Sequence, residues 1–294
     1  MKKNFLLVMV FFFMLTRLSS ALEWKKIHNE ADATTLQKAQ KSVLKNPNSI
    51  PDLYRLSLVD LNLHKDNDAK GIYTKILSLD PKSLEALWGQ AEVLRRQDKL
   101  EESNKILNKI IKSNPKFSPA LISLAYIQYT LLKFDDAAQL AKKVIDQGKD
   151  NVDLSNYTRA HLILAGSKGM IASRGGLFSK FINGTAVLPL LKKAQKLQPD
   201  SPAVLFGLGS YYFLAPHIAG GNLDKAIYYL ELAVKADPLF ADAHVRLAQA
   251  FKTKGDIKKY QEHLNKAIQI DPLNALALDE KNKKCKFNCS TVHE

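Results

Sequence analysis

Apolar residues recur along most of the chain at the three- and four-residue spacing of amphipathic helices, and no stretch shows the sustained period-two pattern of a half-buried strand. The segment 241–272 is a clear example. A large and a small packing residue, Leu247 and Ala248, line a first helix, a Gly-Asp turn follows, and Leu264 and Ala267 line a second helix. This pattern predicts two antiparallel helices joined by a short turn.

Prolines mark the ends of several such segments. Pro81 and Pro115 are 34 residues apart, and so are Pro238 and Pro272. Helix pairs of this length closed by proline resemble the tetratricopeptide repeat family, which has the same period. The resemblance covers about residues 30–272 and implies an all-α, right-handed superhelical solenoid of antiparallel helix pairs, each packed on the next.

The repeat also predicts how the chain is organised. About six helix pairs occupy residues 50–272, and the fourth and fifth pairs are longer than the others. The expected divisions are a signal peptide at 1–21, an N-terminal segment at 22–49 with a capping helix from about residue 29 to 45, regular units at 50–81, 84–115 and 118–149, irregular units at 153–199 and 202–238, a regular unit at 241–272, and a basic C-terminal tail at 273–294.

The N-terminus has the composition of a secretory signal peptide. Two lysines precede an apolar run from Phe5 to Leu15, and small residues lead up to Ala21. Eleven apolar residues are too few to span a bilayer, which needs about 20. We therefore expect cleavage after Ala21 and a soluble periplasmic or secreted protein; an uncleaved anchor or a buried helix is the alternative.

The chain is basic, with a formal net charge of +14. Removing residues 1–21 would delete three basic residues and no acidic one, which leaves +11. Such a surface could meet an anionic membrane, cell wall or acidic partner, but solvated helix faces are the favoured explanation. The lysines are scattered and not interleaved with aromatic residues, so no nucleic-acid partner is expected.

Motifs that carry catalytic chemistry are missing from the sequence. It contains no dinucleotide fingerprint, phosphate-binding loop, paired zinc histidines or nucleophile elbow, so we expect neither an enzyme nor a cofactor or metal. The two cysteines, Cys285 and Cys289, are expected to form a local disulfide after export. The lysine, arginine and asparagine clamp that tetratricopeptide proteins use for a terminal carboxylate is also absent from the corresponding positions.

Apolar and aromatic side chains occupy the positions that should face the groove of the solenoid. An exposed contiguous apolar surface usually marks a binding site, so these residues are the predicted partner or ligand site. The alternative is ordinary core, if the superhelix curls tightly or an insert fills it. The predicted site comprises Tyr54, Leu58, Trp88, Arg95, Ile122, Tyr126, Tyr129, Met170, Phe206 and Phe213.

Extra residues fall between the two helices of both irregular units, at 170–184 and 214–221. Their glycines permit unusual backbone angles, and their apolar residues could fold over the mouth of the groove as a rim or lid. A helix extension that ends at glycine is the alternative. The predicted rim residues are Arg174, Gly175, Gly176, Phe178, His217, Gly220 and Gly221.

The APxxxGG pattern within residues 157–238 is similar to that of exported bacterial tetratricopeptide proteins, most nearly the periplasmic partner component of tripartite carboxylate transporters. Members of that group are often lipid-anchored, whereas no cysteine lies near Ala21. The resemblance implies a scaffold that docks a binding protein or handles a small hydrophobic ligand. We therefore expect an exported scaffold that binds a protein or peptide through its groove; the alternative is a periplasmic carrier of a small hydrophobic ligand.

Overall fold

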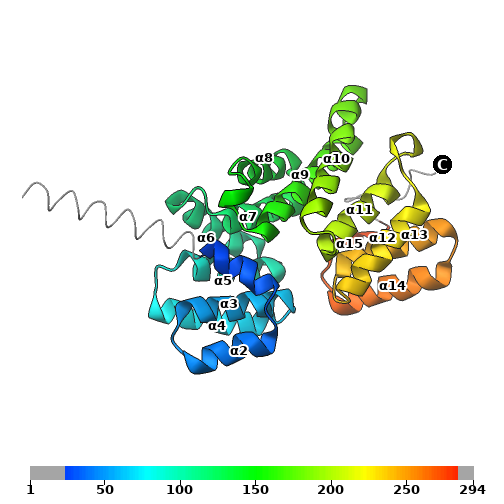
Figure 1. Cartoon of the computed structure of the whole chain (residues 1–294). Coiled ribbons are helices and arrows are strands. Elements are labelled where there is room, and N and C mark those ends of the chain that lie inside the picture. Colours follow the sequence, from blue (N-terminus) through cyan, green and yellow to red (C-terminus); the bar gives the residue numbers. More distant parts are fainter. Residues whose placement is uncertain (1–23, 284–294) are drawn as a thin grey trace, which may run out of the picture. The chain divides into compact units, whose positions relative to one another are not determined.

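The computed structural model describes residues 24–283, and this part of the chain consists of helices and connections without a strand (Figure 1). The predicted all-α fold of paired helices is confirmed. Residues 24–32 are helical and are followed by α2 Leu36–Lys45, α3 Ile50–Asn62, α4 Asp66–Leu79, α5 Leu84–Arg96, α6 Leu100–Ser113, α7 Ser118–Thr130, α8 Phe134–Ile145, η1 Lys149–Asn151, α9 Leu154–Arg174, α10 Leu177–Leu197, α11 Pro202–Leu214, η2 His217–Ala219, α12 Leu223–Ala236, α13 Ala241–Lys254, α14 Ile257–Ile270 and α15 Ala275–Lys281.

The predicted signal peptide and the predicted pairing of Cys285 with Cys289 lie outside the described residues, so both stay predictions. Among residues 24–283, no helix combines the length and apolar character needed to cross a membrane. The segment expected as a basic tail begins with α15, whose Leu276 and Ala277 are buried against α13 and α14. The first part of that segment therefore belongs to the packed structure.

The helices form two compact units. Unit 1 contains residues up to 124 together with 146–157, and unit 2 contains 125–145 together with residues from 158 onward. Within unit 1, α3 packs on α4 and α5 on α6; within unit 2, α11 packs on α12 and α13 on α14.

The turns within the helix pairs repeat with the period of the prolines. His64, Asp98 and Leu132 each have a positive φ, of 59°, 59° and 62°, and they are spaced 34 residues apart. Gly255, with φ 86°, ends α13 at the corresponding turn. A left-handed residue at this joint stops the first helix and reverses the chain, so the second helix returns antiparallel to it.

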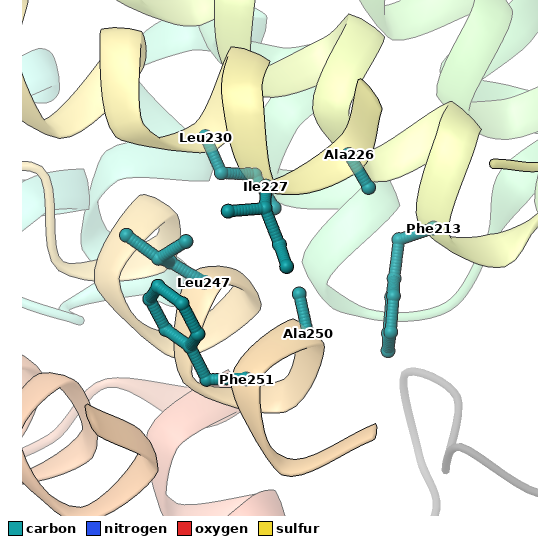
Figure 2. Close-up of a cluster of buried hydrophobic side chains, with 7 residues drawn as sticks. All are labelled: Phe213, Ala226, Ile227, Leu230, Leu247, Ala250 and Phe251. Carbon is teal, nitrogen blue, oxygen red and sulfur yellow. The ribbon is translucent and has the colours of Figure 1, made fainter. Parts of the chain in front are cut away.

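Small residues allow the helices to approach each other closely. In unit 1 a Cβ added to Gly89 on α5 would lie 2.2 Å from the ring of Tyr73 on α4, so only glycine leaves room for that buried ring. In unit 2, α11, α12 and α13 share one core cluster (Figure 2). This cluster consists of Phe213, Ala226, Ile227, Leu230, Leu247, Ala250 and Phe251.

Candidate functional site

The inner face of unit 1, formed by the predicted groove residues of α3, α5 and α7, is covered by the chain's own N-terminal helix, residues 24–32. Trp24, Ile27, His28 and Ala31 are buried and lie on one side of that helix at the spacing of an amphipathic face. His28 Nε2 lies 2.7 Å from the hydroxyl oxygen of Tyr54. The N-terminal helix thus occupies the place predicted for a ligand.

Aromatic rings make up much of this contact. The ring centroid of Trp24 lies 5.0 Å from that of Phe117, and the ring of His28 lies 5.6 Å from that of Trp88. Both distances are within the range of favourable aromatic pairs. The N-terminal helix is therefore packed into the aromatic face and does not simply lie over it.

Polar contacts hold the N-terminal helix on two sides. Arg55 on α3 pairs with Glu30 at 2.9 Å, and the backbone N–H of Leu154 donates to Asn29 Oδ1 at 2.9 Å. Lys25 also donates to the carbonyl oxygen of Asp150. These contacts fix both the rotation and the position of the helix along the face.

Four of the predicted groove residues in unit 1 are consequently core residues. Tyr54, Leu58, Trp88 and Ile122 expose between 2% and 6% of their surface. Burial raises the pKa of the Tyr54 hydroxyl well above its usual value, because a phenolate would lose its hydration there. In this unit the alternative interpretation, ordinary core, describes these residues, although the segment that covers them is the N-terminal helix and not an insert.

Glu92, which the sequence-based site omitted, organises the polar contacts of this face. The indole N–H of Trp88 donates to Ser123 Oγ at 3.0 Å, and that hydroxyl donates to Glu92 Oε2 at 2.7 Å. Arg95, the remaining candidate residue of unit 1, is partly exposed and pairs with Glu92 at 2.7 Å, while Arg96 contacts the same carboxylate at 3.4 Å.

These partners decide the protonation state of the Glu92 carboxylate. Burial alone would raise its pKa, but the two guanidinium groups and the serine hydroxyl hold that pKa well below its usual range. The carboxylate is therefore charged and fully engaged with neighbouring groups. Its role is structural, because an acid or base in catalysis needs an accessible proton position.

In unit 2 the predicted groove residues divide into buried and partly exposed ones. Met170 and Phe213 are buried, and Phe213 belongs to the core cluster in Figure 2. Tyr126, Tyr129 and Phe206 remain partly exposed. The partly exposed aromatic side chains leave unit 2 with an inner face that a partner can reach.

Tyr129 is anchored at the side of this face. Its ring meets that of Phe134 at 5.1 Å with an edge-to-face angle of 69°, and it also packs against Gly166 on α9. Burial raises the pKa of the Tyr129 hydroxyl to about 12, with the charge of Arg246 acting in the opposite direction. The hydroxyl is therefore a neutral hydrogen-bonding group at any physiological pH.

Polar atoms without a hydrogen-bond partner lie buried on four successive first helices of unit 2. They are Gln128 Oε1 on α7, Ser167 Oγ on α9, Ser210 Oγ on α11 and Arg246 Nε on α13. Buried polar groups are nearly always satisfied in folded proteins, so a row of unsatisfied ones needs an explanation. None was among the sequence-predicted site residues. Ser167 and Ser210 occupy the same inner-face position of their repeats, but Gln128 and Arg246 do not, so no common repeat position signalled the set.

Arg246 is the charged member of this row. It is buried, and burial lowers the pKa of its guanidinium. One of its terminal nitrogens donates to Gln249 Oε1 at 2.8 Å, and Gln249 in turn donates to Glu280 Oε2 on α15 at 2.9 Å. The guanidinium is thus oriented by a chain of contacts, while its buried Nε–H has no hydrogen-bond partner.

The two predicted rim segments differ from each other. Residues 170–184 continue α9 to Arg174, turn at Gly175 and Gly176, and enter α10, so the helix-extension interpretation describes them. Arg174 lies over the ring of Phe134 at 4.7 Å, and the side chain of Phe178 is exposed.

The loop at 214–221 is a compact turn. His217 starts the single-turn helix η2, and Gly220 follows with φ 92°. The N–H of Gly221 donates to the carbonyl of Pro216 at 3.0 Å, and the hydroxyl of Tyr211 donates to that of Ala219. A Cβ on Gly221 would lie 1.9 Å from a backbone oxygen of Ala215, so this position requires glycine. The loop reverses the chain tightly and positions Asn222, which caps α12.

Within residues 24–283, no group of three or more His, Cys, Asp or Glu side chains is placed to hold a metal ion. His244 and His263 form a pair on α13 and α14, with their Nδ1 atoms 3.0 Å apart. Burial lowers the pKa of both imidazoles, which keeps the pair neutral near pH 7.

Comparison with known families identifies the repeat. Residues 85–116, 188–238 and 241–272 each match a tetratricopeptide repeat model. The chain therefore contains tetratricopeptide repeats, as the proline period predicted. Repeats of this type stack into extended concave surfaces that many repeat proteins use for binding. The matches concern the repeat alone, so the resemblance to a transporter component stays a prediction.

Solved structures of repeat proteins share the fold. A thermophilic tetratricopeptide protein of Thermus thermophilus is 16% identical with a TM-score of 0.56, over 68% of this chain and 98% of its own. A repeat protein from Parabacteroides merdae is 16% identical with a TM-score of 0.52, over 89% of this chain and 98% of its own. Human IFIT1, solved as a dimer with m7Gppp-AAAA, is 18% identical with a TM-score of 0.56, over 85% of this chain and 60% of its own.

Proposed function

We propose that this protein is an exported interaction scaffold and that the inner face of unit 2 binds a segment of a partner protein. The observation that carries the proposal is the set of unsatisfied polar atoms on α7, α9, α11 and α13, together with the partly exposed rings of Tyr126, Tyr129 and Phe206 on two of these helices. An unsatisfied buried polar group costs about 1–3 kcal/mol, so several in one row favour a bound state that supplies their partners.

The chemistry of the row indicates what kind of ligand would fit. Ser167, Ser210 and Arg246 offer donors, and Gln128 offers an acceptor. A peptide backbone presents acceptors and donors in regular succession and could satisfy both kinds. Tyr126 and Phe206 add partly exposed apolar surface on two of the same helices, α7 and α11, and aromatic side chains often dominate binding energy at protein interfaces.

Unit 1 contributes differently in this proposal. Its inner face already holds an amphipathic helix, residues 24–32, in the manner of a helix-in-groove complex. Unit 1 is thus the supporting part of the scaffold, and unit 2 carries the accessible surface. The proposal of export depends on the signal-peptide pattern of residues 1–21, and the intact mass of the native protein tests it: a mature chain beginning at Leu22 is expected.

Site-specific crosslinking tests the binding face. A photoreactive residue replaces Tyr126 in one variant and Tyr228, an exposed tyrosine on α12, in a matched control. In envelope extract of the source organism, we expect position 126 to give a discrete protein adduct that position 228 does not give. Adducts of equal yield at both positions, or none at 126, would contradict the proposed face.

A second measurement separates the scaffold from the carrier of a small hydrophobic ligand. Native mass spectrometry of the purified protein records whether a small molecule is retained. A mass equal to that of the polypeptide alone, together with a protein adduct at position 126, supports the scaffold. A retained apolar molecule that is lost in Tyr126→Ala and kept in Tyr228→Ala would instead establish the carrier.

A further inference from the structure

The hairpin of α9 and α10 is the longest helix pair of the repeat array. Each of its helices has 21 residues, whereas the other helices of the array have 12 to 14. At 1.5 Å per residue, the additional length extends the pair by about 10 Å. In Figure 1 this pair projects beyond the neighbouring helices of unit 2.

Large apolar side chains are exposed at the end of this hairpin. Leu177, Phe178, Phe181 and Ile182 expose 86%, 79%, 72% and 47% of their surface. They occupy the first two turns of α10 at a spacing that places them on one side of the helix. We call these four residues the tip patch. A contiguous apolar surface of this kind marks a place where a protein meets another phase or molecule.

The helix pair that carries the tip patch has charged side chains of one sign only. Residues 154–199 contain seven Lys or Arg residues and no Asp or Glu. Lys180 lies within the tip patch sequence, and Arg174 and Lys168 lie on the adjoining part of α9. The absence of acidic residues over both helices is specific to this pair, since the chain as a whole has 29.

We propose that the tip patch docks on an anionic phospholipid bilayer. Its leucine, isoleucine and phenylalanine side chains would enter the boundary between headgroups and acyl chains, while the nearest basic residues, Lys180 and Arg174, would meet lipid phosphates. A projecting apolar surface can insert into a bilayer without a matching pocket. A protein partner would have to provide an apolar pocket of complementary shape. The uniform positive charge supplies the complementarity that favours an anionic lipid surface.

A local fluorescent reporter tests insertion directly. The chain has two tryptophans, Trp24 and Trp88, and both are buried. Phe178→Trp would therefore add the exposed indole. With vesicles of phosphatidylcholine and phosphatidylglycerol, we expect a blue shift of its emission and quenching by lipids labelled in the acyl region. An emission spectrum that does not change on adding these vesicles would overturn the proposal.

Paired variants test whether the tip patch supplies the affinity. Phe178→Ser with Phe181→Ser removes two apolar anchors, and Leu44→Ser with Leu273→Ser removes two exposed leucines elsewhere. In vesicle flotation we expect the tip variant to lose about tenfold in apparent affinity or more, and the control to stay near the wild type. Equal binding by all three proteins would overturn the proposal.

A second pair of variants tests whether binding to the vesicles requires positive charge at the tip patch. Lys180→Glu should weaken binding to the anionic vesicles, whereas Lys258→Glu, on exposed α14 surface, should leave it almost unchanged. Added salt should weaken wild-type binding. Light scattering on the same proteins in solution detects the competing possibility: a dimer that dissociates in the Phe178→Ser, Phe181→Ser variant would make the tip patch a self-association surface and overturn the bilayer proposal.

These results are separable from the outcome for the proposed binding face. Crosslinking at position 126 reports on the inner face of unit 2, and the vesicle measurements report on the end of the hairpin. Either can fail while the other stands.

Discussion

Replacement of Trp88 by alanine is the sharpest test of the inner face of unit 1. A solvent-filled groove would predict weaker binding with little change in stability. The structure predicts the opposite, because Trp88 exposes only 3% of its surface and packs beneath the N-terminal helix. Truncating a buried tryptophan to alanine costs about 3–5 kcal/mol. For a chain of this size, that loss lowers the melting temperature by about 6–20 °C.

Thermal unfolding followed by circular dichroism measures this change, and fluorescence adds a local probe. Trp88→Ala leaves Trp24 as the only tryptophan. If the N-terminal helix loosens when its aromatic support is removed, the emission of Trp24 shifts to the red well before global unfolding. The same variant therefore reports both the loss of stability and the release of residues 24–32.

Two comparisons make the result interpretable. Trp88→Phe keeps a ring but loses the hydrogen bond to Ser123, so it should cost about 1–2 kcal/mol. Tyr126→Ala truncates a partly exposed ring and should cost less than Trp88→Ala. Truncation of a buried Trp88 requires a decrease in melting temperature much larger than about 2 °C. A Trp88→Ala protein that melts within about 2 °C of the wild type would therefore show that this side chain does not pack beneath the N-terminal helix.

Three further predictions concern particular contacts. Gly221→Ala should lower the free energy of unfolding by about 2 kcal/mol or more, because the added Cβ would clash with the backbone of Ala215. Gly71→Ala places a Cβ in open space on a helix and should raise the free energy of unfolding by up to about 1 kcal/mol. Denaturant titration of both variants measures the difference. Glu92→Gln should lower the free energy of unfolding by about 2 kcal/mol. This is less than for a fully buried ion pair, because the side chains of Arg95 and Arg96 still reach water. An unchanged midpoint in urea unfolding would contradict this prediction. Burial lowers the pKa of His244 and His263 below 6.5, so as the pH falls these imidazoles bind protons more readily in the unfolded chain than in the folded one. The free energy of unfolding should therefore decrease as the pH drops below about 6.5. A variant with glutamine at both positions should show a smaller decrease of the melting temperature over the same pH range.

Local sequence patterns were sufficient to predict the helix pairs. The prolines at 34-residue intervals and the small residues at tight contacts report interactions within one pair or between neighbours. The same patterns could not distinguish groove from core, because an aromatic residue at position 54 or 88 has the same spacing whether it faces water or another helix. That distinction depended on residues 24–32, a segment too short and too mixed in composition to be assigned from sequence alone.

The candidate site of unit 2 shows the same limit in a different way. Tyr126 and Phe206 were found because aromatic residues at inner positions are conspicuous. Ser167, Ser210 and Arg246 became candidates only when their neighbours were known, since a polar atom is unsatisfied or satisfied according to its surroundings. Phe178 was expected to fold over a groove, but burial depends on tertiary packing, and its side chain is 79% exposed.

The N-terminal helix also determines the order in which unit 1 is completed. Contacts within a helix pair join residues close in sequence, whereas the hydrogen bond from Leu154 N–H to Asn29 spans 125 positions. Non-local contacts form slowly because the intervening chain must first be ordered. The contact between Asn29 and Leu154 therefore forms late, although residues 24–32 are synthesised before the repeats that receive them. Until it forms, the N-terminal helix has only its nearer partners, such as Tyr54 and Arg55 on α3, and the aromatic face beneath it is less firmly covered against a chaperone.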